Sequence, residues 1–160
     1  MVTGTSGNPR LKVFVIGLLA LTAAQAGQAS GPVTAAPNAA ALLQMEVQAD
    51  AAKPREQCYL YTQLVTALMD TASQQVAAGE DEDAGKTVGR IAEVTAKLQR
   101  TAGRDAKKLK DAEKLLGESR RRLMELSRIA SGEQRDVMRS TLLKLDAAHN
   151  KILDLVFLQP

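Results

Sequence analysis

The sequence predicts an all-α protein: an up-and-down antiparallel bundle of three to four long helices, with a short helix before them. Apolar side chains recur every three or four residues over long segments, which is the period of one helix face. The sequence has no alternating strand pattern and no Asn-Gly hairpin turn. Short breaks at glycine or proline separate the segments, and connections of that length favour antiparallel neighbours.

The first 29 residues are predicted to be a signal peptide. Arg10 and Lys12 precede an apolar run over residues 13–24, and small-x-small triplets end at Ala26 and Ala29. This order of features is typical of secretory leaders, with cleavage after one of the two alanines. The run is shorter than the roughly 20 residues that cross a bilayer as a helix. We therefore expect secretion into a bacterial periplasm or beyond, with no transmembrane segment after cleavage.

Loss of the leader changes the charge balance. The chain has 21 basic and 18 acidic residues, and cleavage removes Arg10 and Lys12 but no acidic residue, which leaves 19 against 18. A nearly neutral domain has no strong field to attract nucleic acid. Aromatic residues, on which bases and sugars stack, are scarce and include no tryptophan. We therefore expect the partner to be another protein or an envelope component.

A short helix is predicted over residues 39–52, after a flexible lead-in over residues 30–38. The lead-in consists of small, uncharged residues and proline, which bury little surface. Asn38 is a good N-cap, and Lys53-Pro54 interrupts the helical pattern. Residues 39–160 then form a single helical domain, with the short helix packed across the bundle or loosely held.

The next two helices are predicted over residues 54–78 and 81–101. Gly79 ends the first, and the acidic run over residues 80–83 opens the second, where negative charge suits the helix dipole. The inward stripe of the first contains Cys58, Tyr61, Val65, Leu68, Ala72 and Val76, and that of the second contains Ala84, Val88, Ile91, Thr95 and Leu98.

The last two helices are predicted over residues 105–131 and 133–158, divided at Gly132. The first has a heptad-like inward stripe of Leu109, Ala112, Leu116, Ser119, Leu123, Leu126 and Ala130. The second presents Met138, Leu142, Leu145, Ile152 and Val156. Together with the preceding pair, these helices supply the bundle.

Cys58 and His149 are the only residues of their types, and the pattern predicts a structural position for both. A single cysteine excludes an intrachain disulfide, so Cys58 is either buried on its apolar stripe or free to join a second chain. A single histidine cannot build a histidine-based metal site, and His149 follows the apolar stripe of the last helix. We favour burial for Cys58 and a core or boundary position for His149.

Two short motifs resemble ligand-binding loops but lack essential residues. Gly85-Lys86-Thr87 matches the end of a phosphate-binding loop, yet Glu80 stands where that loop needs glycine. The acidic run lacks two of the ligands of a calcium-binding EF-hand loop, because Ala84 and Ile91 occupy their positions. No catalytic, cofactor-binding or metal-ligating residues are predicted, and no cofactor.

A basic stretch runs from Arg100 through Arg120-Arg121-Arg122 and suggests an anionic partner when taken alone. Acidic residues are interleaved with it four residues away: Lys107 with Asp111, Lys114 with Glu118, Glu118 with Arg122 and Arg121 with Glu125. Such pairs are typical of an exposed, solvated helix face. We favour that interpretation.

The segment Lys53-Pro54-Arg55-Glu56-Gln57-Cys58-Tyr59-Leu60-Tyr61, followed by Leu64-Val65, resembles a group of uncharacterised exported helical proteins of bacteria. The likeness extends over about 100 residues. It implies export and a helical fold, and it carries no assigned activity or site residues.

The sequence therefore favours an exported, non-enzymatic helical bundle that acts through its surfaces, in an envelope-binding, adaptor or scaffold role. The alternative is a small-ligand or metal carrier with a pocket between helices, for which Thr95, Ser119 and His149 are the inward polar groups. A hydrolase whose residues meet only in space is a third hypothesis. The oligomeric state is left open.

Overall fold

The computed structural model describes residues 37–130 and 132–158, all of which belong to one compact unit, Thr34–Pro160. The predicted signal peptide, and all of the predicted lead-in except Pro37 and Asn38, lie outside the described residues.

Five helices make up the described part of the chain, which contains no strand, so the all-α prediction is confirmed. One short helix precedes four long ones, as expected. Their bounds are α1 Ala39–Ala51, α2 Pro54–Ala78, α3 Asp81–Thr101, α4 Leu109–Ile129 and α5 Gly132–Phe157.

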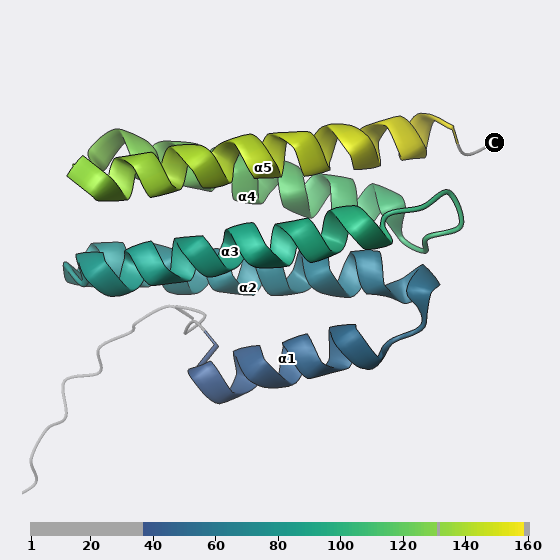
Figure 1. Ribbon diagram of the computed structural model, residues 1–160, viewed down its shortest axis with the longest axis horizontal. Helices are drawn as coiled ribbons and strands as arrows, with labels where there is room; N and C mark the ends of the chain where they lie inside the picture. The colour runs from purple at the N-terminus through teal and green to yellow at the C-terminus, as the bar shows by residue number, and fades with distance from the viewer. Residues whose placement is uncertain (1–36, 131, 159–160) are drawn as a thin grey trace, which may run out of the picture. The chain divides into compact units, whose positions relative to one another are not determined.

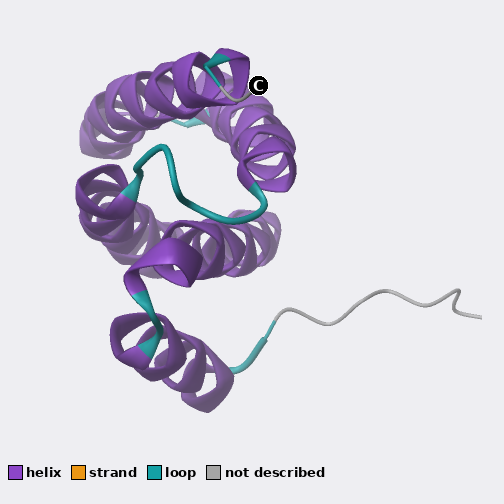
Figure 2. Ribbon diagram, turned by 90° about the vertical axis from the view of Figure 1, so that its right-hand side faces the viewer, coloured by secondary structure: helices purple, strands orange, loops and turns teal. Residues whose placement is uncertain are grey.

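The four long helices pack in a bundle of two hairpins, α2 with α3 and α4 with α5, and α1 lies outside it against α2 (Figure 1). Helices α2 and α4 are neighbours, and so are α3 and α5, whereas α3 and α4 lie diagonally across the bundle. Figure 2 shows the α3–α4 connection running across one end of the bundle.

Helices that face each other from different hairpins, α2 with α4 and α3 with α5, run parallel. This differs from the predicted bundle of antiparallel neighbours. Along the contact between α2 and α4, which we call the α2–α4 seam, Thr66 meets Ser119 and Asp70 meets Arg122. Residue numbers rise in the same direction on both helices, so the two helices are parallel. Consecutive helices do run antiparallel, as predicted. The difference arises because the chain leaves α3 and crosses to the diagonal position instead of the adjacent one.

Apolar residues predicted to face inward form one continuous core. All five predicted α3 positions are buried, and the α4 stripe is buried except for Leu126, which is half-buried. The largest fully buried side chains in the core include Leu64, Met69, Ile91, Leu98, Leu109, Leu116, Leu123, Leu145 and Ile152. Burial of aliphatic side chains, at roughly 1.5–3 kcal/mol each, therefore holds the fold together without a disulfide.

Helix ends follow local signals in most places. The Asn38 side chain accepts a hydrogen bond of 2.9 Å from the Ala41 N–H, and α2 ends at Gly79, whose φ of 74° suits glycine. The exception is α4, which begins at Leu109 instead of the predicted Asp105. Here the Lys107 N–H donates to the Arg55 carbonyl at 2.7 Å, so the chain is held in a turn until it reaches α4.

Candidate functional site

Helix α1 is fastened to the bundle along one edge by two carboxylates. Lys97 Nζ on α3 lies 2.9 Å from Glu46 Oε1 and 3.1 Å from Asp50 Oδ1. Arg90 also pairs with Glu46, and the Tyr61 hydroxyl donates to Asp50. Because Glu46 is only 13% exposed, this edge of α1 is closely applied to its neighbours. The helix is therefore held in one orientation, which the sequence left open.

These contacts shift the pKa values of the side chains that form them. The hydrogen bond from Lys97 lowers the pKa of Glu46, and that from Tyr61 lowers the pKa of Asp50. The bond to Glu46 raises the pKa of Lys97, and burial raises that of Tyr61. Both carboxylates are therefore stabilised in the charged form that the contact needs.

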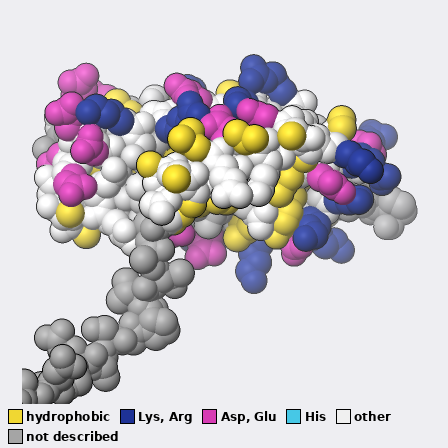
Figure 3. All heavy atoms as spheres, turned by 90° about the horizontal axis from the view of Figure 1, so that it is seen from below, with side chains coloured by type: hydrophobic (Ala, Val, Ile, Leu, Met, Phe, Trp, Pro, Cys, Tyr) yellow, Lys and Arg dark blue, Asp and Glu magenta, His cyan; other side chains and the backbone are white. Residues whose placement is uncertain are grey.

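The opposite side of α1 carries no charge at all. We call it the α1 outer face, and it consists of six exposed residues at helical spacing: Ala40, Leu43, Gln44, Val47, Gln48 and Ala51. Leu43 is 62% exposed and Val47 is 66% exposed. Figure 3 shows this side of the molecule, where apolar side chains gather in the middle. A solvent-facing helix surface is ordinarily polar or charged, so this composition is unusual.

A groove continues the α1 outer face toward α3. It has a volume of about 280 Å³ and is lined by Ala39, Leu42, Leu43, Glu46, Leu64, Leu68 and Arg90. Leu43 belongs to both the groove and the outer face. The floor is aliphatic, and the Glu46–Arg90 pair stands at its margin. The outer face and the groove thus form one surface with charge at the edge.

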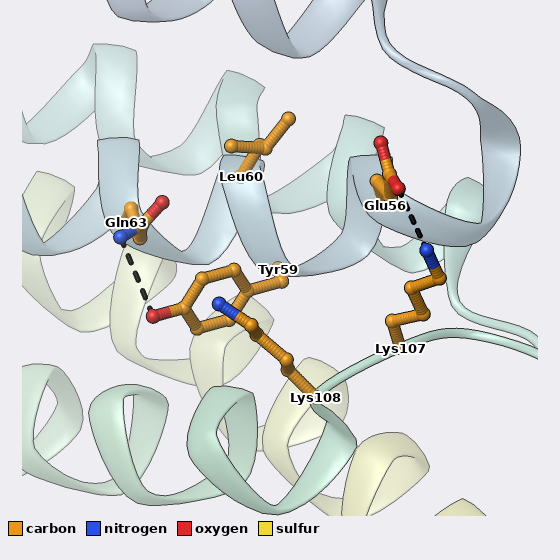
Figure 4. A pocket seen from close by; sticks show the side chains of 6 residues that line it. All are labelled: Glu56, Tyr59, Leu60, Gln63, Lys107 and Lys108. Carbon is orange, nitrogen blue, oxygen red and sulfur yellow. Dashed lines mark hydrogen bonds and ion pairs between the residues drawn. The ribbon is translucent and has the colours of Figure 1, made fainter.

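A second hollow lies beside the N-terminus of α2, with a volume of about 350 Å³ (Figure 4). The Lys108 ammonium lies 4.5 Å from the centre of the Tyr59 ring, and Lys107 pairs with Glu56 at 2.9 Å. Gln63 Nε2 donates to the Tyr59 hydroxyl at 3.4 Å. Each polar group that lines the hollow thus has a partner within the hollow itself.

Lys108 owes its position to a left-handed backbone. Its φ is 56° and ψ is 35°, and it is the only residue other than glycine with positive φ among those that the structure describes. This conformation ends the α3–α4 connection and starts α4. It also allows consecutive lysines, Lys107 and Lys108, to line the same hollow.

The structure confirms the predicted burial of Cys58 and the boundary position of His149. Cys58 is fully buried, and burial raises the pKa of its thiol to about 11, so the thiolate is disfavoured. His149 Nε2 lies 2.9 Å from Glu113 Oε1, which joins α5 to α4. A Cβ on Gly117 would lie 3.3 Å from the same nitrogen, so glycine makes room for the imidazole.

The three inward polar groups of the predicted carrier do not converge on a shared space. Thr95 is buried and donates to the carbonyl of Ile91 in its own helix at 2.7 Å. Ser119 lies 3.5 Å from Thr66 on the α2–α4 seam, and His149 bonds across the other seam of α4. Each group is satisfied where it stands.

The basic stretch pairs differently from the prediction. No ion pair joins the predicted partners four residues apart on the described part of α4. Instead, Arg122 binds Asp70 of α2 at 2.6 Å and Arg120 binds Asp146 of α5 at 3.1 Å. These arginines lie at the seams with neighbouring helices, where carboxylates of those helices are within reach. The stretch is therefore partly a structural feature of the bundle.

The acidic run over residues 80–83 opens α3 as predicted, and Lys86 pairs with Glu82 and Asp83 at 2.8 and 3.1 Å. Within residues 37–130 and 132–158, no three metal-ligating side chains are grouped to hold an ion. None of the described helices combines the length and hydropathy needed to cross a bilayer. Comparison with family models, characterised proteins and solved structures finds no match to this chain.

Proposed function

We propose that this chain is an exported, non-enzymatic binding protein that docks an amphipathic helix of a partner protein on the α1 outer face and its groove. The supporting observation is that α1 presents exposed Leu43 and Val47, with no charged residue, beside an apolar groove. A helix that lays an apolar stripe into a groove is an established mode of peptide recognition. The role is that of an adaptor or scaffold.

The dimensions of the surface favour a partner helix over a second copy of the chain. At 1.5 Å per residue, the 13 residues of α1 span about 20 Å. A strip of that length, about 10 Å wide, offers far less than the roughly 800 Å² per subunit of a standard stable interface. A single helix of similar length matches it.

Charge at the margin indicates the chemistry of the partner. Glu93 and Arg90 pair at 2.9 Å, and their side chains are 65% and 44% exposed. A partner helix with an apolar stripe of three or four residues and polar flanks would bury Leu43 and Val47 while leaving these groups in water. Specificity then comes from the polar flanks and affinity from the buried apolar anchors.

Export is part of the proposal and is supported by the sequence of the first 29 residues. The basic start, the apolar run over residues 13–24 and the triplets ending at Ala26 and Ala29 favour secretion to the periplasm or the cell exterior. The partner would then be a protein or another component of the cell envelope.

The experiment compares a double variant of the α1 outer face with a single control variant at a similarly exposed leucine of α5. In Leu43→Gln/Val47→Gln, the α1 outer face becomes polar, whereas Leu143→Gln changes an α5 residue that is also 66% exposed. The full chain and both variants are produced in a bacterial host with a photo-crosslinker at Gln48, and adducts are collected from the envelope. We expect an adduct that the α1 variant loses and the Leu143 variant keeps. Equal adduct yields from all three proteins contradict the proposal.

A further inference from the structure

Three arginines line a hollow between the end of α4 and the start of α5. The hollow has a volume of about 380 Å³ and is lined by Ser127, Arg128, Arg135, Arg139 and Leu142. Gly132, with φ of 54°, lies in the tight reversal between the two helices, which brings Arg128 beside the other two. We call this group the arginine cluster.

Only one of the three guanidinium groups is engaged with the protein. Arg135 donates from Nε and a terminal nitrogen to the Ala130 carbonyl, at 2.9 and 2.6 Å. Arg128 and Arg139 form no hydrogen bond or ion pair with any residue that the structure describes. Arg120 and Arg122 differ from these two residues, because each binds a carboxylate of a neighbouring helix.

Like charges held around one hollow repel one another unless an anion lies between them. The nearest acidic residues along the chain, Glu125, Glu133 and Asp136, pair with none of the three arginines in the described structure. Guanidinium groups bind oxyanions through two parallel N–H···O bonds and stay charged at every physiological pH. Leu142 adds an apolar wall to the hollow.

We propose that the arginine cluster is a binding site for a phosphate group. A phosphate dianion offers more acceptor oxygens and more charge than a carboxylate, so it can bridge two guanidinium groups at once. Arg128 and Arg139 provide the contacts, and Arg135 stays on the Ala130 carbonyl and adds positive charge. The phosphate belongs either to a small soluble monoester or to a phospholipid head group, whose diester phosphate carries one negative charge and two free oxygens. Both accept N–H···O bonds from guanidinium groups.

The test titrates the full chain with inorganic phosphate at about pH 7.5, where phosphate is mainly dianionic. Binding is followed by calorimetry at low ionic strength. Arg128→Gln and Arg139→Gln are expected to weaken binding roughly tenfold or more each, because each removes a charge-assisted hydrogen-bonding group. Arg100→Gln, an exposed arginine near the end of α3, is the matched loss of one charge and is expected to bind as the wild type does. Unchanged melting of all variants separates loss of the site from loss of the fold.

Vesicle flotation distinguishes the sources of the phosphate. Vesicles of phosphatidylcholine alone are compared with vesicles that also contain phosphatidylglycerol. Flotation that needs phosphatidylglycerol, Arg128 and Arg139 assigns a lipid head group, whereas phosphate binding without flotation assigns a soluble ester. The proposal is overturned if neither phosphate nor the anionic vesicles bind, or if Arg100→Gln loses as much binding as the cluster variants.

Discussion

The left-handed backbone at Lys108 gives a quantitative prediction with a definite sign. A residue with a Cβ costs about 1–2 kcal/mol in this conformation, and glycine escapes that cost. Lys108→Ala and Lys108→Gly both remove the ammonium that lies 4.5 Å from the Tyr59 ring centre, so the cation–π term cancels in their comparison. We therefore expect the glycine variant to be more stable than the alanine variant by about 1 kcal/mol, or roughly 4 °C in Tm.

The assay is urea unfolding monitored by circular dichroism. The dependence of the free energy of unfolding on urea concentration must be equal for both variants. Lys114, an exposed residue inside α4, serves as the control. There, alanine should be more stable than glycine by about 0.5–1 kcal/mol, which is the opposite order. If alanine is also the more stable residue at position 108, then α4 begins earlier than Leu109 and the account of this turn is wrong.

Two further predictions concern the docking of α1 and the core. The pKa values of Glu46 and Asp50 lie below their ordinary 4.5 and 3.8, so the stability that their pairing provides is present above those values. It is lost as pH falls through the lowered pKa values. Protection against hydrogen exchange, corrected for the intrinsic effect of pH on the exchange rate, should then fall in α1 before it falls in α3; simultaneous loss of protection would contradict this. Leu123→Asp should unfold the domain, at a cost of roughly 4 kcal/mol or more, because it leaves a charge at a fully buried position. An unchanged melting curve would show that the inner face of α4 is wrongly assigned.

Helix existence and inner faces were predictable from the sequence because both depend on local spacing. The bounds of α2 and α3 follow from Pro54, Gly79 and the acidic run, which act within one turn of the helix end. The start of α4 was not predictable. It depends on a bond from the Lys107 N–H to the Arg55 carbonyl, whose partner is far away along the chain.

The parallel packing of the hairpins was equally inaccessible to local patterns. An apolar stripe states which side of a helix is buried but not which neighbour covers it. The pairing of Asp70 with Arg122 reflects the diagonal crossing of the α3–α4 connection, whereas that of Asp146 with Arg120 joins the two helices of the second hairpin. From the sequence of α4 alone, its arginines were predicted to pair with acidic residues four positions away. In the structure, Arg120 and Arg122 pair with carboxylates of neighbouring helices instead.

The α1 outer face and the arginine cluster differ in how far the sequence alone could predict them. The uncharged face of α1 is visible there, since Glu46 and Asp50 are the only charges in the helix and lie on the same side. The arginine cluster is not visible, because Arg128 and Arg139 are brought together by the reversal at Gly132. The cluster can be identified only once the packing of α4 against α5 is known.

The orientation of α1 links its ion pairs to the proposed function. Burial of Leu43 and Val47 could contribute roughly 1.5–3 kcal/mol each, but a rotation of α1 that hid them would expose Leu42, Met45 and Ala49, which pack against the core. Such a rotation would carry Glu46 and Asp50 away from Lys97 and leave Glu46 without its partners. The ion pairs and the apolar contacts of the inner side therefore both hold α1 in the orientation that keeps Leu43 and Val47 exposed. The exposed apolar face is thus a fixed feature of the fold, and this is the physical reason to propose binding as its role.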